Sequence, residues 1–266
     1  MTVPFALTLT SLGLVGAFIA GMLGVGGAIV MVPLLLYAPP LLGLPHLDMK
    51  AVAGITMVQV LVAAVSGVVA HQRMRAVHGE LAWLGGPTMA IGSFAGAVAS
   101  RDLSDRTLLL VFALMATGAL AVLVVRVETA GQPIVAEQVT IPRGRAIAVC
   151  ASVGVCAGLV GAGGAFLLVP LLIAVVGVPI RITIGSSLAI TAMAAVTGFA
   201  GKLITGQIPW GPAVFVALGA APGAQLGALV SRRLSGERLR LALFVVVLLT
   251  AARVWWDLLR QLTSGG

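Results

Sequence analysis

The chain has 266 residues, of which 60% are hydrophobic and only 9% are charged, and its mean hydropathy is +1.15. Soluble domains carry about 25% charged residues, so this composition excludes a soluble domain. The net charge of +8 does not indicate a nucleic-acid partner, because the basic residues gather in short connections between hydrophobic runs, where they anchor and orient membrane helices. We therefore predict an all-α polytopic membrane protein.

Hydrophobic stretches of membrane-spanning length follow one another along the chain. We expect residues 4–24 to form a first helix rather than a cleaved signal, because no basic segment precedes them and no cleavage signature ends them. Further uncharged runs of ~20 residues are each long enough to cross a hydrocarbon core of ~30 Å as a helix. These runs are 51–70, 81–100, 107–125, 182–201 and 210–230.

Two parts of the sequence are near copies of each other. Residues 21–35 read GMLGVGGAIVMVPLL and residues 158–172 read GLVGAGGAFLLVPLL, with nine of fifteen positions identical. Internal repeats of this kind are typical of secondary transporters. We predict two homologous transmembrane repeats, 1–126 and 146–266, joined by a polar linker at 127–145. Each repeat would hold one glycine-broken helix followed by three uninterrupted helices.

The glycine break allows two paths for the chain. If each broken segment crosses the membrane once, the sixteen Lys and Arg residues divide eight and eight between the two sides; if it turns back, they divide ten and six. The second path leaves three crossings in each half, an odd number, and so inverts one repeat relative to the other. Because positive residues favour the cytoplasmic side, we favour the re-entrant, inverted arrangement, with a continuous pair of helices as the alternative.

Each glycine run also predicts a new helix start at membrane depth. Unpaired backbone groups survive in hydrocarbon only where protein or a water-filled cavity satisfies them. Helices that restart at 28–37 and 165–178 would present free N–H groups and positive dipole ends, which favour an anion, and glycine lets a substrate approach the backbone closely. The alternative explanation is that the glycines only allow tight helix packing.

Polar side chains within the spans support an anion site. Their hydroxyl and amide groups can hydrogen-bond an oxyanion, or they can bond their own helix. His71 and Lys202 end the helices that carry these groups, where they could draw an anion to a pore mouth or snorkel to the interface. The candidate substrate-binding residues are Gly24, Gly26, Gly27, Thr56, Gln59, Gly161, Gly163, Gly164, Ser186, Ser187, His71 and Lys202, with Thr191 and Thr197 in the same spans and Gln225 as a weaker candidate.

Small residues at four-residue spacing predict helix-packing seams. The ladders are Gly92, Gly96 and Ser100 in the first repeat and Gly219, Gly223, Gly227 and Ser231 in the second. Ser104 and Ser235 follow them and are expected to be N-caps. Cys150 and Cys156 lie six residues apart in one apolar stretch and are interpreted as packing residues rather than as a disulfide or a metal site.

Acidic residues are missing from the predicted spans, since all eight lie in loops or at helix ends. Cation transporters and most proton relays carry carboxylates within the membrane, so a metal cation permease is disfavoured. The GxGG motif lacks the Lys-Ser/Thr of a phosphate-binding loop, which argues against an ATP-driven pump. We predict no enzyme activity, no cofactor and no bound metal.

The paired pattern resembles the TauE/SafE sulfite exporter-like family. The residues that carry the resemblance are the two glycine motifs, followed by AGITM at 53–57 and IGSSL at 184–188. The resemblance implies a multi-pass inner-membrane transporter. Its expected partners are a small sulfur-containing anion, such as sulfite or an organosulfonate, and the lipid bilayer. It also implies that the motif glycines bind the anion. A non-transporting membrane subunit of sulfur metabolism and a metal cation permease are the alternatives, and a homo-oligomer is left open.

Overall fold

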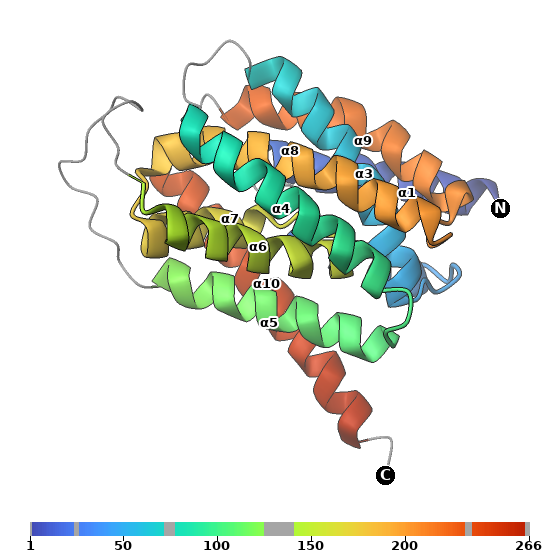
Figure 1. Cartoon of the computed structure of the whole chain (residues 1–266). Helices are drawn as coiled ribbons and strands as arrows, with labels where there is room; N and C mark the ends of the chain where they lie inside the picture. The colour runs from blue at the N-terminus through green and yellow to red at the C-terminus, as the bar shows by residue number, and fades with distance from the viewer. Residues whose placement is uncertain (1, 24–26, 72–77, 125–140, 232–235, 264–266) are drawn as a thin grey trace.

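The computed structural model describes residues 2–23, 27–71, 78–124, 141–231 and 236–263, and within these ranges every regular element is helical (Figure 1). The elements are α1 (Val3–Leu23), α2 (Ala28–Leu41), α3 (Met49–His71), α4 (Gly79–Ala99), α5 (Asp105–Val124), α6 (Arg143–Val160), α7 (Ala165–Leu171), η2 (Leu172–Val176), α8 (Ile180–Ile204), α9 (Trp210–Ser231) and α10 (Gly236–Thr263). The all-α class is confirmed.

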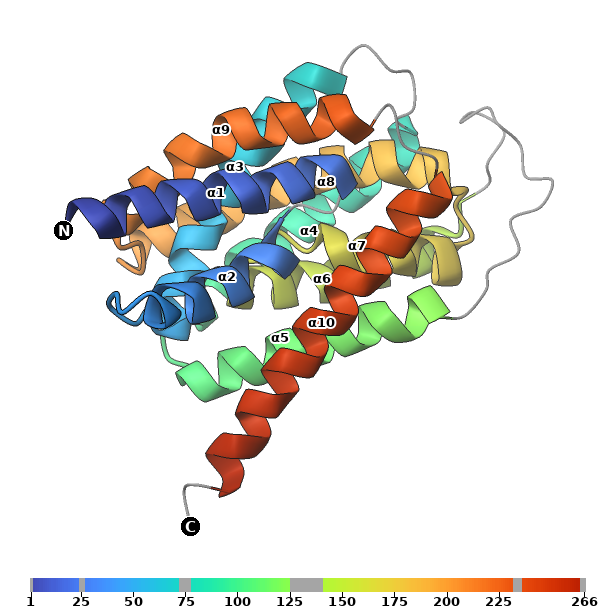
Figure 2. The same cartoon turned by 180° about the vertical axis from the view of Figure 1, so that it is seen from behind.

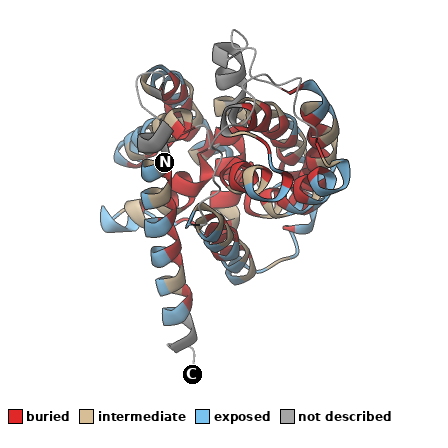
Figure 3. Ribbon diagram, turned by 90° about the vertical axis from the view of Figure 1, so that its left-hand side faces the viewer, coloured by how far each residue is buried: buried red, intermediate tan, exposed pale blue. Residues whose placement is uncertain are grey.

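Seven of the described helices are long and apolar enough to cross a membrane: α1, α4, α5, α6, α8, α9 and α10. Large apolar side chains such as Trp83, Leu114 and Leu218 are exposed, and Figure 3 shows the buried residues concentrated toward the middle of the bundle. Exposed apolar surface on this scale marks a face that lipid covers. The protein is therefore a multi-pass membrane protein, as its composition predicts.

The chain reverses direction at each glycine run. α2 runs back beside α1, and α7 with its π-helical continuation η2 runs back along α6 (Figures 1 and 2). The second restarted helix is thus shorter than the predicted 165–178 and changes to a π-helix at Leu172, just after Pro170, which has no N–H to donate to the helical ladder. α1 and α6 run in opposite directions in both views.

Helix pairing follows a regular exchange pattern. α1 packs against α9 and α4 packs against α6, while α3 packs against α9 and α8 packs against α4. If α1–α5 are exchanged in order with α6–α10, the α1–α9 pair becomes the α6–α4 pair, and the α3–α9 pair becomes the α8–α4 pair. This is the pattern that two equivalent halves would give, and opposite helix directions are what an inverted arrangement requires. The duplication itself, its 127–145 linker and its relation to the membrane plane stay predictions.

Glycines bring two of these helix pairs into backbone contact. A Cβ on Gly158 of α6 would overlap Ser93 O of α4 and lie 2.8 Å from Ala97 N. In the other pair, side chains on Gly219, Gly223 and Gly227 of α9 would overlap backbone oxygens of α1. Cβ atoms on Gly92 and Gly96 of α4 would likewise meet backbone atoms of α6, so the glycines of both predicted ladders lie in packing seams, as expected.

Three further expectations concern single residues. Ser104 Oγ accepts a hydrogen bond from Thr107 N at 3.1 Å and caps α5, as predicted, whereas Ser235 lies outside the described residues. Cys150 and Cys156 are free thiols on α6.

The expected absence of acids from the spans is wrong for Asp257, which lies within the apolar window Leu241–Arg260 of α10. Asp257 Oδ1 accepts from Arg253 Nη1 at 2.6 Å, one helical turn away, so its charge is paired locally.

Candidate functional site

The motif glycines form the helix ends at the two reversals. Gly27 is the N-cap of α2 with φ 79°, and Gly164 is the N-cap of α7 with φ 72°; no side chain caps either start. Gly161 ends α6 with φ 71°, and Gly163 has φ 62°. L-residues with side chains rarely adopt this left-handed conformation, which explains the glycines locally. Gly24 and Gly26 lie outside the described residues.

The surroundings of the two breaks differ. A Cβ on Gly161 would overlap Ala53 O of α3, and a Cβ on Gly164 would lie 2.6–2.9 Å from side chains of α4 and α6. The tight-packing explanation therefore applies at these two glycines. At Gly27 the neighbours are Ala20 Cβ and the side-chain amide of Gln59, each 2.8 Å from an ideal Cβ. The start of α2 thus faces a polar group.

Gln59 is fully buried on α3, yet neither its Nε2 nor its Oε1 has a hydrogen-bond partner. Thr191 on α8 is 1% exposed, and its Oγ1 is also without a partner. Leaving a buried donor or acceptor unpaired costs about 1–3 kcal/mol, and nearly all such groups in folded proteins are paired. These atoms are therefore the part of the interior that a polar ligand or water would satisfy.

The two unpaired side chains belong to the same region of the α3–α8 contact. Val60, which follows Gln59 in the chain, would be overlapped by a Cβ on Gly163, and Thr191 Cγ2 lies 3.4 Å from that same Cβ position. The reversal before α7 thus lies against both helices. The Gln59 amide thus lies at the restart of α2 and Thr191 lies beside the reversal before α7; Thr191 was not in the main candidate set, and the anion site stays a prediction.

Other predicted hydroxyls already have partners. Thr56 Oγ1 donates to Val52 O of its own helix at 2.8 Å, which is the local alternative that the sequence left open. Ser186 Oγ accepts from the backbone N of His78 at 2.9 Å, and Thr197 Oγ1 donates to Ala90 O at 2.7 Å. Ser187 is fully buried. Ser186 and Thr197 therefore join α8 to α4, and Thr56 bonds within α3, rather than lying free for a ligand.

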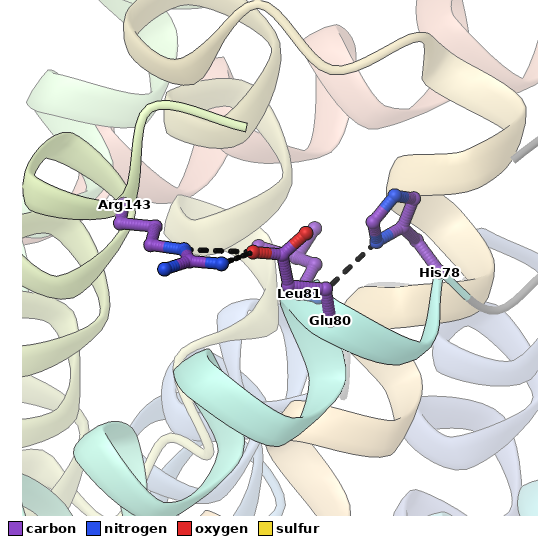
Figure 4. Close-up of polar contacts among 4 residues, drawn as sticks. All are labelled: His78, Glu80, Leu81 and Arg143. Carbon is purple, nitrogen blue, oxygen red and sulfur yellow. Dashed lines mark hydrogen bonds and ion pairs between the residues drawn. The ribbon is translucent and has the colours of Figure 1, made fainter. Parts of the chain in front are cut away.

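The start of α4 shows what Ser186 holds in place. His78 Nδ1 accepts from Leu81 N at 3.2 Å and caps the helix, and Glu80 forms an ion pair with Arg143 of α6 at 2.8 Å (Figure 4). The Ser186 hydroxyl is therefore a structural contact between α8 and the residue that caps α4.

Lys202 lies elsewhere than expected. It occupies the last turn of α8, but its side chain is fully buried rather than extended to the interface. Its Nζ donates to Ser100 Oγ at 2.6 Å, to Gln207 Oε1 at 3.0 Å and to Leu159 O at 3.3 Å. The snorkelling interpretation is wrong, because the α4 and α6 ends enclose the ammonium group. His71 ends α3, and its side chain lies outside the described residues.

The partners of Lys202 are all neutral. Within the part of the chain that the structure describes, the only ion pairs are Arg143–Glu80 and Arg253–Asp257. Burying an ammonium costs several kcal/mol even after the protein relaxes, whereas a cation at a helix C-terminus such as that of α6 contributes at most about 2 kcal/mol. Capping does not offset the burial, so this lysine is a functional candidate. Sequence reasoning missed Gln207, because nothing marks a loop amide as a partner of a distant lysine.

A pocket of about 190 Å³ lies apart from these residues, at the end of α2 and the starts of α3 and α5. Asp48, Asp105 and Asp257 line it together with His46 and Arg106. Three carboxylates make it a poor place for an anion.

The sequence model of the family described as "Sulfite exporter TauE/SafE" matches residues 9–254, from α1 to α10. The chain belongs to this family. It is 30% identical over 257 residues to a "Probable membrane transporter protein" of Xylella fastidiosa (strain Temecula1), covering 94% of each chain. It is also 24% identical over 272 residues to "Probable membrane transporter protein YunE" of Bacillus subtilis (strain 168), covering 94% of this chain and 97% of that protein. No solved structure matches.

These findings confirm the resemblance seen in the glycine motifs and make the chain a membrane transporter of the TauE/SafE family. The names of the relatives give no substrate. For this TauE/SafE protein the substrate must therefore be argued from the interior of the bundle.

Proposed function

We propose that this TauE/SafE protein exports small sulfur-containing anions, such as sulfite or an organosulfonate, across the bacterial inner membrane. The anion binds where α2 restarts, between α3 and α8. The family description, which names sulfite export, supports the substrate class. The buried, unpaired amide of Gln59 beside Gly27 is the observation that carries the site.

The chemistry of these groups suits a sulfur oxyanion. The first N–H groups of α2 point out of an uncapped helix start, where the dipole is positive. Gln59 Nε2 and Thr191 Oγ1 add side-chain donors from two further helices. Sulfite and sulfonates carry three oxygens on one sulfur, so they can accept from several converging donors at once, and binding would relieve the unpaired groups.

The path of the chain supports transport rather than static binding. Two restarted helices run back into the bundle in opposite directions, and broken helices that meet at mid-membrane are the usual substrate sites of repeat-built secondary transporters. In such transporters, one bundle moves against the other around the site and opens it to each side in turn.

Transport of labelled sulfite into liposomes that contain the purified protein tests the proposal. Gln59→Leu removes both amide atoms at similar volume, and we expect sulfite transport to fall about 10-fold or more, the value of one or two lost hydrogen bonds. The stability of the variant should be unchanged or higher, because an unpaired buried amide is replaced by an apolar group.

Gln225→Leu is the matched control, because Gln225 is exposed on α9, and it should leave transport unchanged. If Gln59→Leu transports sulfite as well as the wild type, the site is wrong. If wild-type vesicles take up no more sulfite than empty ones, the substrate class is wrong.

A further inference from the structure

Thr250 on α10 makes a hydrogen bond that differs from those of other helical threonines in the protein. A threonine inside a helix commonly donates to the carbonyl four residues back, as Thr8, Thr10 and Thr88 do. Thr250 Oγ1 donates instead to Ile29 O of α2 at 3.1 Å. Thr250 is 5% exposed and Ile29 is fully buried, so this bond joins two helices in the interior of the protein.

The acceptor of this bond is a carbonyl that lacks its usual donor within α2. In an α-helix, Ile29 O would accept from the backbone N–H of residue 33, but that residue is Pro33, which has no N–H. A buried carbonyl without a donor is unfavourable, and in the interior of a membrane protein no bulk water replaces the donor. The Thr250 hydroxyl therefore takes the place of the missing N–H.

The two restarted helices differ where each passes its proline. α2 keeps its α-helical form through Pro33 and ends at Leu41. Pro170 occupies the corresponding place in the second glycine motif, and there the α-helix ends at Leu171 and continues as the π-helix η2. The helix that receives the Thr250 hydroxyl is the regular one.

The bond holds the first turn of α2, at the proposed anion site. Ile29 is the second residue of α2 after the N-cap Gly27. The N–H groups of the two residues that follow Ile29 donate to Gly27 O at 3.1 and 2.9 Å, so the N–H groups of Ala28 and Ile29 are the ones that the helix leaves without an acceptor. Ile29 thus offers its N–H to the anion while Thr250 holds its carbonyl.

We propose that Thr250 is a positioning residue for the anion site, which fixes the first turn of α2 so that its N–H groups face the anion. The proposal rests on the proposed function. Thr250 lies at the middle of the apolar window Leu241–Arg260, so the helix start that it holds lies near the middle of the α10 span. Without this bond the first turn would adopt the binding orientation for only part of the time, and the apparent affinity would fall by that fraction.

The test measures KM and the maximal rate of labelled sulfite transport in liposomes. Thr250→Val keeps the volume and removes the hydroxyl, and we expect KM to rise about 5- to 10-fold, the factor for one lost hydrogen bond, with little change in the maximal rate. Thr250→Ser restores the hydroxyl and should return KM to within about 2-fold of the wild type. Thr10→Val is the matched control and should leave KM unchanged, because Thr10 Oγ1 donates to Ala6 O of its own helix at 3.0 Å.

A change within α2 separates the hydrogen bond from other effects of the substitution. Pro33→Ala supplies the missing N–H to Ile29 O, so in that background Thr250→Val should change KM by less than about 2-fold. The double variant also covers the case in which Thr250→Val alone does not fold. Because the carbonyl then has a donor within its own helix, the double variant should fold.

An equal rise of KM in both backgrounds would show that Thr250 does not act through Ile29 O. An unchanged KM in Thr250→Val, with or without a lower maximal rate, would show that Thr250 supports the fold rather than the anion site. Either result, or failure of the double variant to fold, would overturn the inference and leave the proposed function standing. Absence of sulfite transport by the wild type would overturn both.

Discussion

Adding a single methyl group at Gly27 tests the helix start directly. Gly27→Ala must adopt φ 79°, and its Cβ would lie 2.8 Å from both Ala20 Cβ and Gln59 Nε2. The left-handed backbone costs about 1–2 kcal/mol for an L-residue, and forcing a methyl into a filled space costs about 1–3 kcal/mol more. We therefore expect the free energy of unfolding to fall by about 2–5 kcal/mol.

Gly43→Ala is the matched control. Gly43 has φ 69°, but nothing lies within 4 Å of a Cβ at that position. It carries the backbone cost alone, about 1–2 kcal/mol. The difference between the two variants isolates the space beside Gln59.

Both variants are assayed by thermal unfolding in detergent and by labelled sulfite transport in liposomes. Gly27→Ala must displace the amide of Gln59, so we expect its transport to fall at least 10-fold, whereas Gly43→Ala should transport like the wild type. If the folded Gly27→Ala protein transports as well as Gly43→Ala, the substrate does not use this space, and the argument for a site at the start of α2 fails.

Two further variants, each with a control, test separate parts of the structure. Gly158→Ala should lower the unfolding temperature because its methyl group would overlap Ser93 O. Gly144→Ala, with open space around it, should change stability by less than about 1 kcal/mol. Equal unfolding temperatures in the two variants would contradict a packing seam between α4 and α6. Thr191→Val should reduce sulfite transport and Thr88→Val should not, because Thr88 already donates to Leu84 O at 2.7 Å; equal loss in both would count against Thr191.

The class of the protein and the position of its helices follow from the sequence because they depend on local composition. Runs without charge predict α3, α4, α5, α8 and α9, and glycine runs predict where α2 and α7 begin. The glycine runs also predict a left-handed backbone conformation that only glycine adopts easily. Positive φ angles are found at Gly27, Gly161, Gly163 and Gly164.

Which face of each helix points inward could not be predicted in the same way. A membrane helix is apolar on all sides, so its sequence carries no strong polar stripe to mark the outer face. For that reason Lys202 was expected at a pore mouth or at the interface and is instead buried, and Thr56, a candidate for the site, bonds its own helix. The cluster of Ser100, Gln207 and Lys202 joins residues about a hundred positions apart, and only tertiary packing brings them together.

The membrane potential gives a last prediction, that the anion leaves the cell without a coupling ion. Asp257, the acid found within a described span, is paired with Arg253, and His71 is the remaining candidate to carry a proton near neutral pH. An inside-negative potential of 100 mV favours expulsion of each charge by about 2.3 kcal/mol, hence about 4.6 kcal/mol for a dianion. Since 1.4 kcal/mol is a factor of ten, this sustains an outward gradient of about three decades, whereas uptake of the same anion would need coupling. Liposomes with a potassium diffusion potential and no pH gradient should therefore drive sulfite flux toward the positive side. Flux that ignored the potential but followed an imposed pH step would show proton coupling and refute the argument.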